Sequence, residues 1–387
     1  MVLKQLARYA RRIPLTILAI LVILPCSAAQ RSVHAQTVID DSLDFKIGQM
    51  LMLGFRGTSA TPGSIIVSYL RNLHLGGVIL FDFDVAKREY GRNILSPTQL
   101  ADLTEALQLE APYPLLIAVD QEGGTVARLK PNAGFPPHVS HAWLGEQDDV
   151  ETTAAQADLL ARSLAVVGLN VNFSPVLDLN LNPENPVIGA LGRSFGADPE
   201  LVARHAIIML ESMREQGVLG AIKHFPGHGS SKEDSHKGFV DVSDTWTRKE
   251  LKPFQLVLES GVCDIVMTAH IFNSNLDPVW PATLSRSTIE DVLRRQLGFR
   301  GVVISDDMMM RAITDHYGLE TAIKQAVNAG VDILLFANNS YEYVMDIAPR
   351  AHATLKALVE RGEISQARID EAWGRIRKLK QQLPGLE

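Results

Sequence analysis

Residues 219–229, LGAIKHFPGHG, decide the expected fold, because they place a short apolar run directly before a cluster of polar and charged side chains. The arrangement recurs along the chain. Apolar runs of strand length lie at Met50–Leu53, Gly77–Phe81, Leu115–Val119, Val171–Phe173, Leu219–Ile222, Ile265–Met267, Val302–Ile304 and Val331–Phe336. Several runs are continuous and β-branched rather than alternating, which is typical of parallel strands buried on both faces.

Helical patterns lie between these runs. Pro199–Gln216 carries apolar residues at three-to-four spacing and predicts a helix that ends at Gly217. Ser287 to Glu290 matches a capping box, which would open a helix that ends before Gly298. Eight strands alternating with helices predict the α/β class and a single (β/α)8 TIM barrel, with its active site at the carboxyl ends of the strands.

The alternative fold is an open, doubly wound sheet. Such a sheet usually has a glycine-rich phosphate turn after its first strand. Here the first run continues into Gly54-Phe55-Arg56-Gly57, which matches neither the dinucleotide-binding pattern nor a P-loop. The barrel is therefore favoured.

Composition excludes several classes of protein. The 387 residues include 44 acidic and 37 basic side chains, for a net charge of −7. An excess of acid argues against nucleic-acid binding, which needs basic side chains to neutralise phosphates. Two cysteines are too few for a disulfide scaffold. The length suits one barrel, because single barrels run to about 250 residues or more.

The N-terminal region has a different character. Residues 1–35 contain no acid and five basic residues, Lys4, Arg8, Arg11, Arg12 and Arg31. The apolar run Leu15–Leu24 is shorter than the ~20 residues of a membrane span and is followed by small residues up to Ala35. This pattern predicts a cleaved signal peptide and a periplasmic or secreted protein. The alternative is a membrane anchor, and membrane contact is expected through this segment alone.

The expected organisation follows from these boundaries. We predict a signal peptide at residues 1–35, a lead-in linker at 36–44, a catalytic barrel at 45–380 and a C-terminal tail at 381–387. Oligomerisation is not indicated, and we expect a monomer.

Polar residues follow four of the apolar runs, as a barrel enzyme requires. They are Asp120-Gln121-Glu122, Lys223–Gly229, His270 and Ser305-Asp306-Asp307. A metal hydrolase is disfavoured because Pro226 and Gly227 separate His224 from His228, so their i, i+4 spacing does not indicate one helix face. A serine hydrolase is disfavoured because no G-x-S-x-G elbow is apparent.

A glycoside hydrolase needs a carboxylate and a proton donor on either side of the scissile bond. Asp306 or Asp307 fits the first role. The second fits an acid on another loop, or a histidine held by a carboxylate, as in Asp234-Ser235-His236. Asp307 is expected instead to bond backbone or to pair with Lys223, and His228 is expected to be structural. For His270, contact with substrate and a structural role at the rim are equally favoured.

The motif at residues 223–229 followed by Asp234-Ser235-His236 resembles the signature of the family 3 glycoside hydrolases, in their β-N-acetylglucosaminidase branch. Further motifs resemble that branch in the same order: DQEGG at 120–124, GRSF at 192–195, PATLS at 281–285, LGFRG at 297–301 and SDDM at 305–308. The resemblance covers Phe45 to Leu379 and implies a barrel without the extra C-terminal domain of longer relatives.

The resemblance also implies roles for individual residues. Asp306 would be the nucleophile that forms a covalent glycosyl-enzyme, and His236 the acid/base oriented by Asp234. The hydroxyls of the non-reducing GlcNAc would be held by Asp120, Arg128, Arg193, Lys223 and His224. Thr125 departs from the pattern, because many relatives have an arginine there. Gly227, Gly229 and Gly238 bracket the loop, and we expect loop motion to bring His236 into place when sugar binds.

The sequence thus predicts an exported, retaining exo-β-N-acetylglucosaminidase with no cofactor and no metal. Its substrate would be an oligosaccharide with terminal β-GlcNAc, from peptidoglycan fragments or of the chitin type. Two alternatives stay open. One is a phosphorylase on the same scaffold, since a histidine acid/base would not repel phosphate as a second carboxylate would. The other is a non-catalytic protein that binds cell-wall sugar.

Overall fold

The computed structural model describes residues 41–235 and 238–384. They belong to one compact unit, Ile39–Glu387. The predicted signal peptide and most of the predicted linker lie outside the described residues, as does His236. Within the described part of the chain, no helix combines the length and the hydropathy that crossing a bilayer would require.

Within the described residues, eight parallel strands form one sheet in the order β10-β1-β2-β5-β6-β7-β8-β9. They are β1 (Leu51–Gly54), β2 (Gly77–Ile79), β5 (Leu116–Val119), β6 (Val171–Asn172), β7 (Leu219–Phe225), β8 (Ile265–Thr268), β9 (Val302–Ile304) and β10 (Leu334–Phe336). An isolated parallel bridge between Ile304 and Ile333 completes the ring. Each predicted apolar run overlaps one of these strands, and the predicted TIM barrel is confirmed.

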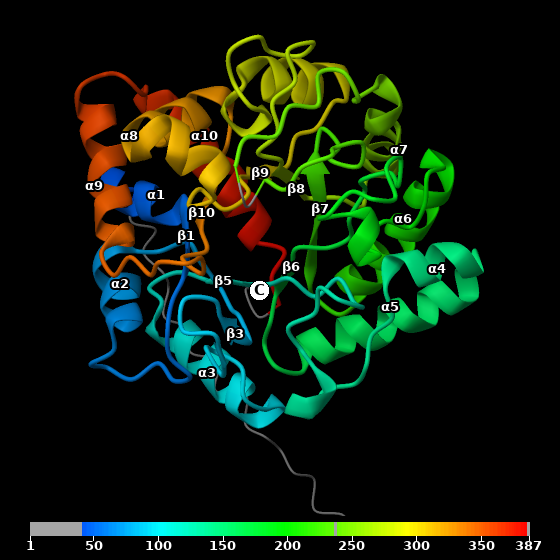
Figure 1. Cartoon of the computed structure of the whole chain (residues 1–387). Helices are drawn as coiled ribbons and strands as arrows, with labels where there is room; N and C mark the ends of the chain where they lie inside the picture. The colour runs from blue at the N-terminus through cyan, green and yellow to red at the C-terminus, as the bar shows by residue number, and fades with distance from the viewer. Residues whose placement is uncertain (1–40, 236–237, 385–387) are drawn as a thin grey trace, which may run out of the picture. The chain divides into compact units, whose positions relative to one another are not determined.

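Helices surround the strands (Figure 1). The helices of the outer ring are α1 (Leu43–Gln49), α2 (Ile65–Leu73), α3 (Pro97–Glu110), α4 (His141–Gln147), α5 (Val150–Ala165), α6 (Pro199–Glu215), α7 (Lys252–Ser260), α8 (Arg311–Ala329), α9 (Ile347–Glu360) and α10 (Gln366–Lys380). The predicted helix over Pro199–Gln216 is confirmed as α6. Its Asp198 cap accepts a hydrogen bond from the Leu201 amide, and Gly217 ends it with a φ of 72°.

The capping box predicted at Ser287 is wrong in its detail. A helix does occupy Ser287–Gln296, but it is a π-helix, and the hydroxyl that accepts the Thr288 amide belongs to Ser285, at 3.0 Å. Ser285 lies two residues before Ser287 and three before Thr288, the spacing at which a capping hydroxyl reaches an amide of the first turn. The helix itself ends before Gly298, as predicted.

The seam between the first and last strands needs a residue without a side chain. On β1, Met52 pairs with Leu335 of β10 on one side and with Gly77 of β2 on the other. A Cβ atom on Gly54 would lie 1.8 Å from the carbonyl oxygen of Ala337, just beyond β10. Glycine at position 54 therefore lets the chain close the ring.

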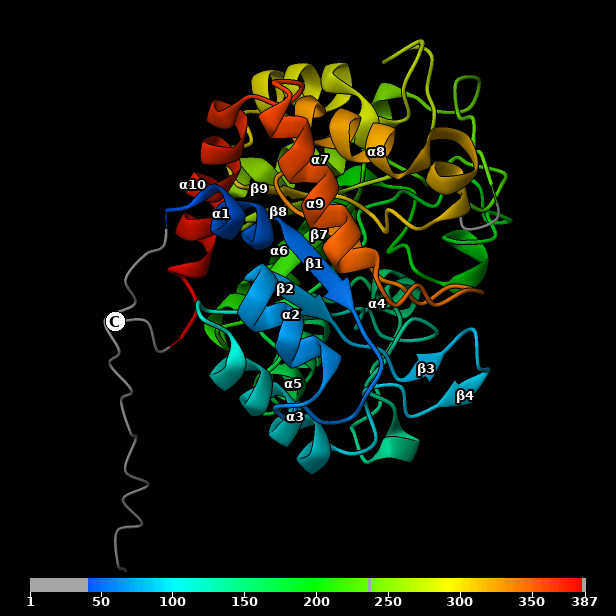
Figure 2. The same cartoon turned by 90° about the vertical axis from the view of Figure 1, so that its left-hand side faces the viewer.

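A short hairpin follows the second strand and was not predicted. It consists of β3 (Phe83–Asp84) and β4 (Glu89–Tyr90), and Figure 2 shows it beyond the carboxyl end of β1. The buried Asp84 carboxylate anchors it, accepting bonds from Arg56 at 2.6 and 2.9 Å and from Arg92 at 2.9 Å. The hairpin becomes part of one rim of the barrel.

Candidate active site

A cavity of about 430 Å³ opens at the carboxyl ends of the strands. Its walls come from segments that follow β2, β5, β6, β7, β9 and β10. Among the lining residues are seven of the eight predicted site residues: Asp120, Arg128, Arg193, Lys223, His224, Asp234 and Asp306. The eighth, His236, lies outside the described residues. The structure therefore brings together side chains that are up to 186 positions apart in the sequence, Asp120 and Asp306.

Lys223 lies at the floor of the cavity, between two carboxylates. Its Nζ is 2.9 Å from Asp120 Oδ1 and 2.6 Å from Glu122 Oε1. Arg128 reaches the other oxygen of Asp120, at 3.5 Å. Burial alone would raise the pKa of Asp120, but the charges of Lys223 and Arg128 outweigh it and hold that pKa below its usual value. Asp120 is therefore ionised at neutral pH and can accept bonds from hydroxyl groups.

Glu122 is a site residue that the sequence did not single out. It is 1% exposed and accepts two bonds from the Arg193 guanidinium, each 2.7 Å long, in addition to its contact with Lys223. Burial would raise the pKa of Glu122, yet Arg193 and Lys223 hold it well below its usual range. A paired, planar guanidinium has a fixed orientation, so Glu122 sets the direction in which Arg193 faces the cavity.

Asp178 is the second residue that was missed. It is fully buried, and its Oδ2 lies 2.6 Å from Nδ1 of His224. The other ring nitrogen, Nε2, lies 3.3 Å from Nη2 of Arg193, and a guanidinium can only donate. Nε2 of His224 therefore accepts from Arg193, and Nδ1 carries a proton that it donates to Asp178. This fixes both the tautomer and the orientation of the ring.

The turn after β7 is tightly packed rather than open. A Cβ on Gly229 would lie 1.8 Å from the Leu179 carbonyl oxygen, and one on Gly227 would lie 2.6 Å from Cβ of Glu250. Gly227 also has a φ of 117°. These two glycines thus have a packing role, independent of the loop motion expected from the sequence, which stays a prediction.

His228, in the same turn, is structural, as expected. Its amide donates to Asp178 Oδ1 at 2.7 Å, Nδ1 lies 2.7 Å from the Ser231 hydroxyl, and Nε2 lies 3.3 Å from the Ser235 hydroxyl. Burial lowers the pKa of His228 to about 4, so the ring is neutral at neutral pH. Its contact with Ser235 links the turn to the segment that carries Asp234.

The segment after β9 presents Asp306 to the cavity. One oxygen of Asp306 accepts the amide of Asp307 at 2.7 Å. Asp307 bonds backbone amides, those of Met309 at 3.1 Å and Ala337 at 2.9 Å, which agrees with the backbone role expected for it. His270 has both ring nitrogens engaged, with the Thr283 hydroxyl at 2.8 Å and the Asp307 carbonyl oxygen at 2.9 Å. His270 thus holds the backbone next to Asp306 through the Asp307 carbonyl oxygen.

Asp234 also contributes to the cavity wall. Its predicted partner His236 falls in the gap of the described residues, so the Asp234–His236 dyad stays a prediction. Within residues 41–235 and 238–384, no three or more His, Cys, Asp and Glu side chains are grouped in a way that could hold a metal ion.

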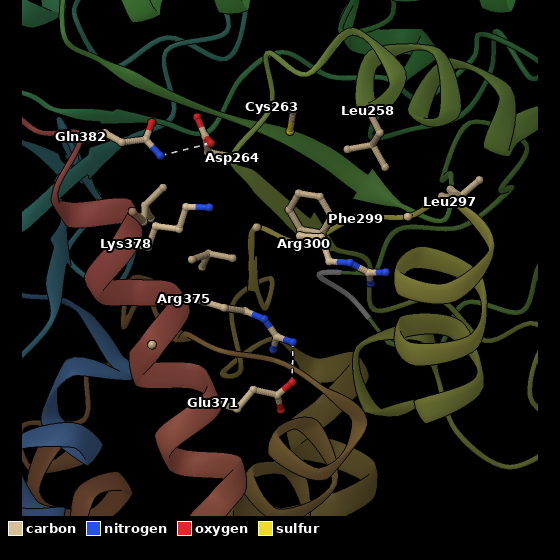
Figure 3. A pocket seen from close by; sticks show the side chains of 15 residues that line it. Leu258, Cys263, Asp264, Leu297, Phe299, Arg300, Glu371, Arg375, Lys378 and Gln382 are labelled. Atoms are coloured by element: carbon tan, nitrogen blue, oxygen red, sulfur yellow. Dashed lines mark hydrogen bonds and ion pairs between the residues drawn. The ribbon is translucent and has the colours of Figure 1, made fainter.

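A second cavity, of about 390 Å³, lies at the opposite end of the barrel (Figure 3). Its walls include Asp264, before β8, the segment 297–301, before β9, and α10. One of its charged groups, Arg375, contacts Glu371 at 2.5 Å and the buried Asp332 at 3.0 Å. In barrel enzymes this end serves stability rather than catalysis.

Comparison with known proteins identifies the scaffold. The profile of the "Glycosyl hydrolase family 3 N terminal domain" matches residues 42–379. "Beta-hexosaminidase A" of Pseudoalteromonas piscicida is 33% identical over 384 residues, which cover 87% of this chain and 61% of that protein. The chain thus spans about three fifths of this relative.

Solved structures give the same result. A family 3 β-N-acetylglucosaminidase from Paenibacillus sp. str. FPU-7 is 39% identical with a TM-score of 0.80, covering 88% of this chain and 62% of its own. A β-N-acetylhexosaminidase from Beutenbergia cavernae is 31% identical with a TM-score of 0.78, covering 88% of this chain and 99% of its own. With the motifs, the barrel and the matched residues in agreement, the chain belongs to glycoside hydrolase family 3.

Proposed function

We propose that this chain is a retaining exo-β-N-acetylglucosaminidase, which removes terminal non-reducing β-linked GlcNAc from oligosaccharides. The observation that carries the proposal is the single cavity that holds Asp306 together with Asp120, Lys223 and His224. The name of the Paenibacillus relative supports GlcNAc as the sugar, and that of the Beutenbergia relative supports an N-acetylhexosamine. Peptidoglycan fragments and chitin-type oligosaccharides both carry such an end.

In the proposed mechanism, Asp306 attacks the anomeric carbon and forms a covalent glycosyl-enzyme, which water then hydrolyses. The Asp307 amide, bonded to one carboxylate oxygen, orients Asp306 for this attack. Asp120 accepts from sugar hydroxyls, while Lys223, Arg128 and Arg193 donate to them. Because these groups are already held by one another, little reorganisation is needed when the sugar enters.

The proton for the leaving oxygen would come from His236, oriented by Asp234. A histidine suits both the acid and the base step, since its ordinary pKa of ~6.5 leaves both forms populated near neutral pH. The location of Asp234 in the cavity wall supports this assignment.

The decisive variant is Asp306→Ala, assayed on an aryl β-GlcNAc. We expect turnover to fall by at least about a thousandfold with folding intact, because the covalent route is lost. Asp315→Ala, an exposed aspartate on α8 that pairs with Arg311, is the matched control and should keep full activity. Ordinary hydrolysis by Asp306→Ala would refute the assignment.

The same assay separates the two alternatives. In phosphate buffer a phosphorylase would yield GlcNAc-1-phosphate, whereas a hydrolase yields free GlcNAc, and mass analysis of the products distinguishes them. A non-catalytic binding protein would retain sugar without turnover. Supplying both muropeptides and chitin oligomers in this assay identifies the substrate class.

We also propose export to the periplasm or the medium, on the basis of residues 1–35. Fractionation of producing cells, with mass analysis of the N-terminus, tests it. Mature protein beginning near residue 36 outside the cytoplasm is expected, and full-length protein confined to the cytoplasm would contradict export.

A further inference from the structure

Glu250 is a buried carboxylate that lies behind the catalytic turn. It belongs to the short 3-10 helix Arg248–Leu251, just before α7, and is fully buried. Its Oε2 accepts the Gly229 amide at 3.0 Å, and its Cβ packs where a side chain on Gly227 would otherwise lie.

The turn is held from two opposite sides. On the Glu250 side, the Trp246 indole also donates to the Pro226 carbonyl oxygen at 3.1 Å. On the other side, Asp178 accepts the His228 amide at 2.7 Å, and Asn185 donates to the His228 carbonyl oxygen at 2.8 Å. His228 in turn contacts Ser235, which lies between Asp234 and His236 in the chain. The contacts that hold the turn thus extend through the His228 side chain to Asp234–Ser235, which we call the acid/base segment because it precedes the predicted acid/base His236 in the chain.

We propose that Glu250 is a positioning residue for the acid/base segment, and that its charge state sets how firmly the Gly227–Ser230 turn holds that segment at the cavity. This inference rests on the function proposed above. An ionised carboxylate accepts the Gly229 N–H in a charge-assisted bond, which is stronger than the bond to a neutral acid. The protonated acid would hold the turn less tightly.

Both charge states of Glu250 are accessible near neutral pH. Burial, together with the negative charge of Asp178 across the turn, raises the pKa of Glu250 to about 7, against the opposing hydrogen bonds from Gly229 and Ser230. The titratable groups facing it are Asp178, from the segment after β6, and His228, from the turn itself. His228 is neutral in this range, and Asp178 is held ionised by its bond with His224, so Glu250 is the group that titrates.

The test compares wild type with Glu250→Gln, which keeps the volume and removes the charge. kcat/KM is measured from pH 5 to 8.5 on 4-nitrophenyl β-GlcNAc, whose leaving group needs little protonation, and on N,N′-diacetylchitobiose, which needs the acid. We expect the variant to lose about fivefold on chitobiose above pH 7, with the ratio of wild type to variant approaching one toward pH 5. The nitrophenyl substrate should be nearly unaffected.

Two further variants keep the result interpretable. Trp246→Phe removes a neutral donor from the same turn, so its loss on chitobiose should be the same at every pH. Glu371→Gln, on α10 at the opposite end of the barrel, should behave as wild type. A wild-type-to-Gln ratio that does not change with pH, or equal losses on both substrates, would overturn the proposal. Absence of turnover by the wild type on both substrates would instead refute the function on which it rests.

Discussion

Glu122 shows how one buried residue can organise a binding site that it does not itself complete. It orients Arg193 by two hydrogen bonds and lies against Lys223, so two of the proposed sugar-binding cations depend on it. Removing one partner from such a cluster leaves buried charges without compensation, which costs more than the pair itself contributes.

We therefore predict that Glu122→Gln lowers both stability and sugar binding. The expected loss of unfolding free energy is about 3 kcal/mol at pH 7, with an increase in KM. Since folding depresses the pKa of Glu122, its contribution is fully present above its ordinary pKa of 4.5 and is lost as the pH falls below that value. Urea unfolding at pH 7 and pH 3.5 measures the loss of stability and its pH dependence. KM on an aryl β-GlcNAc measures the loss of sugar binding.

The difference in unfolding free energy between wild type and Glu122→Gln should accordingly be larger at pH 7 than at pH 3.5. Glu146→Gln, an exposed residue on α4, is the control and should change neither stability nor KM. An equal gap at both pH values would show that Glu122 does not act through its charge.

The sequence predicted the residues that face the cavity, but not the buried residues that hold their side chains in place. Asp120, Lys223 and Asp306 follow apolar runs, so the barrel fold alone places them on one rim. Glu122 and Asp178 act through partners 71 and 46 positions away, and pairing at such separations leaves no local pattern. The position of His236 is still a prediction.

Among the elements, the β3–β4 hairpin is the clearest addition to what the sequence indicated. Its strands have two residues each, too short for any periodicity to appear. The hairpin depends on Asp84. Burial would raise the pKa of Asp84, but the bonds from Arg56 and from neighbouring groups lower that pKa to about 2. The Phe83 carbonyl oxygen accepts from Asn339, which ties the hairpin to the segment after β10.

We predict that Asp84→Asn destabilises the hairpin at neutral pH, by about 3 kcal/mol, because the guanidinium groups of Arg56 and Arg92 lose their common partner. The contribution of ionised Asp84 is present above about 3.8 and declines as the pH falls toward about 2. Hydrogen exchange of the amides of residues 83–90 measures the loss locally.

Asp315→Asn is the control, because it removes an exposed partner of Arg311 and should change stability by less than about 0.5 kcal/mol. Unchanged hydrogen exchange in the hairpin of Asp84→Asn would mean that packing of the Phe83 and Tyr90 rings, whose centroids are 5.0 Å apart, is enough to hold the hairpin. The cap of the helix Ser287–Gln296 could likewise not be predicted from the local pattern, because it depends on which hydroxyl the preceding chain brings within reach of the first turn.

For the whole molecule, closure of the ring depends on contacts between segments almost 300 residues apart. Gly54 on β1 and Ala337 after β10 meet backbone to backbone, at a separation no side chain could occupy. The eight strands could be predicted from apolar runs, but this close approach could not, because it arises only when the first and last strands become neighbours.

We predict that Gly54→Ala destabilises the barrel by about 3 kcal/mol, since the added methyl group must displace the chain at the seam. Gly63→Ala is the matched control, because a Cβ there meets nothing within 4 Å. Chemical denaturation of both variants gives the comparison. Equal stability of the two would show that the seam can yield without cost.

The cavity between α10 and the strands β8 and β9 has a practical consequence for inhibitor discovery. A small molecule that fills it would bind the folded protein alone and raise its melting temperature, as any ligand of the native state does. It would still leave Asp306 open to substrate at the other end of the barrel. A screen based on thermal shift would therefore collect such compounds as false positives, and displacement by GlcNAc would separate them from inhibitors.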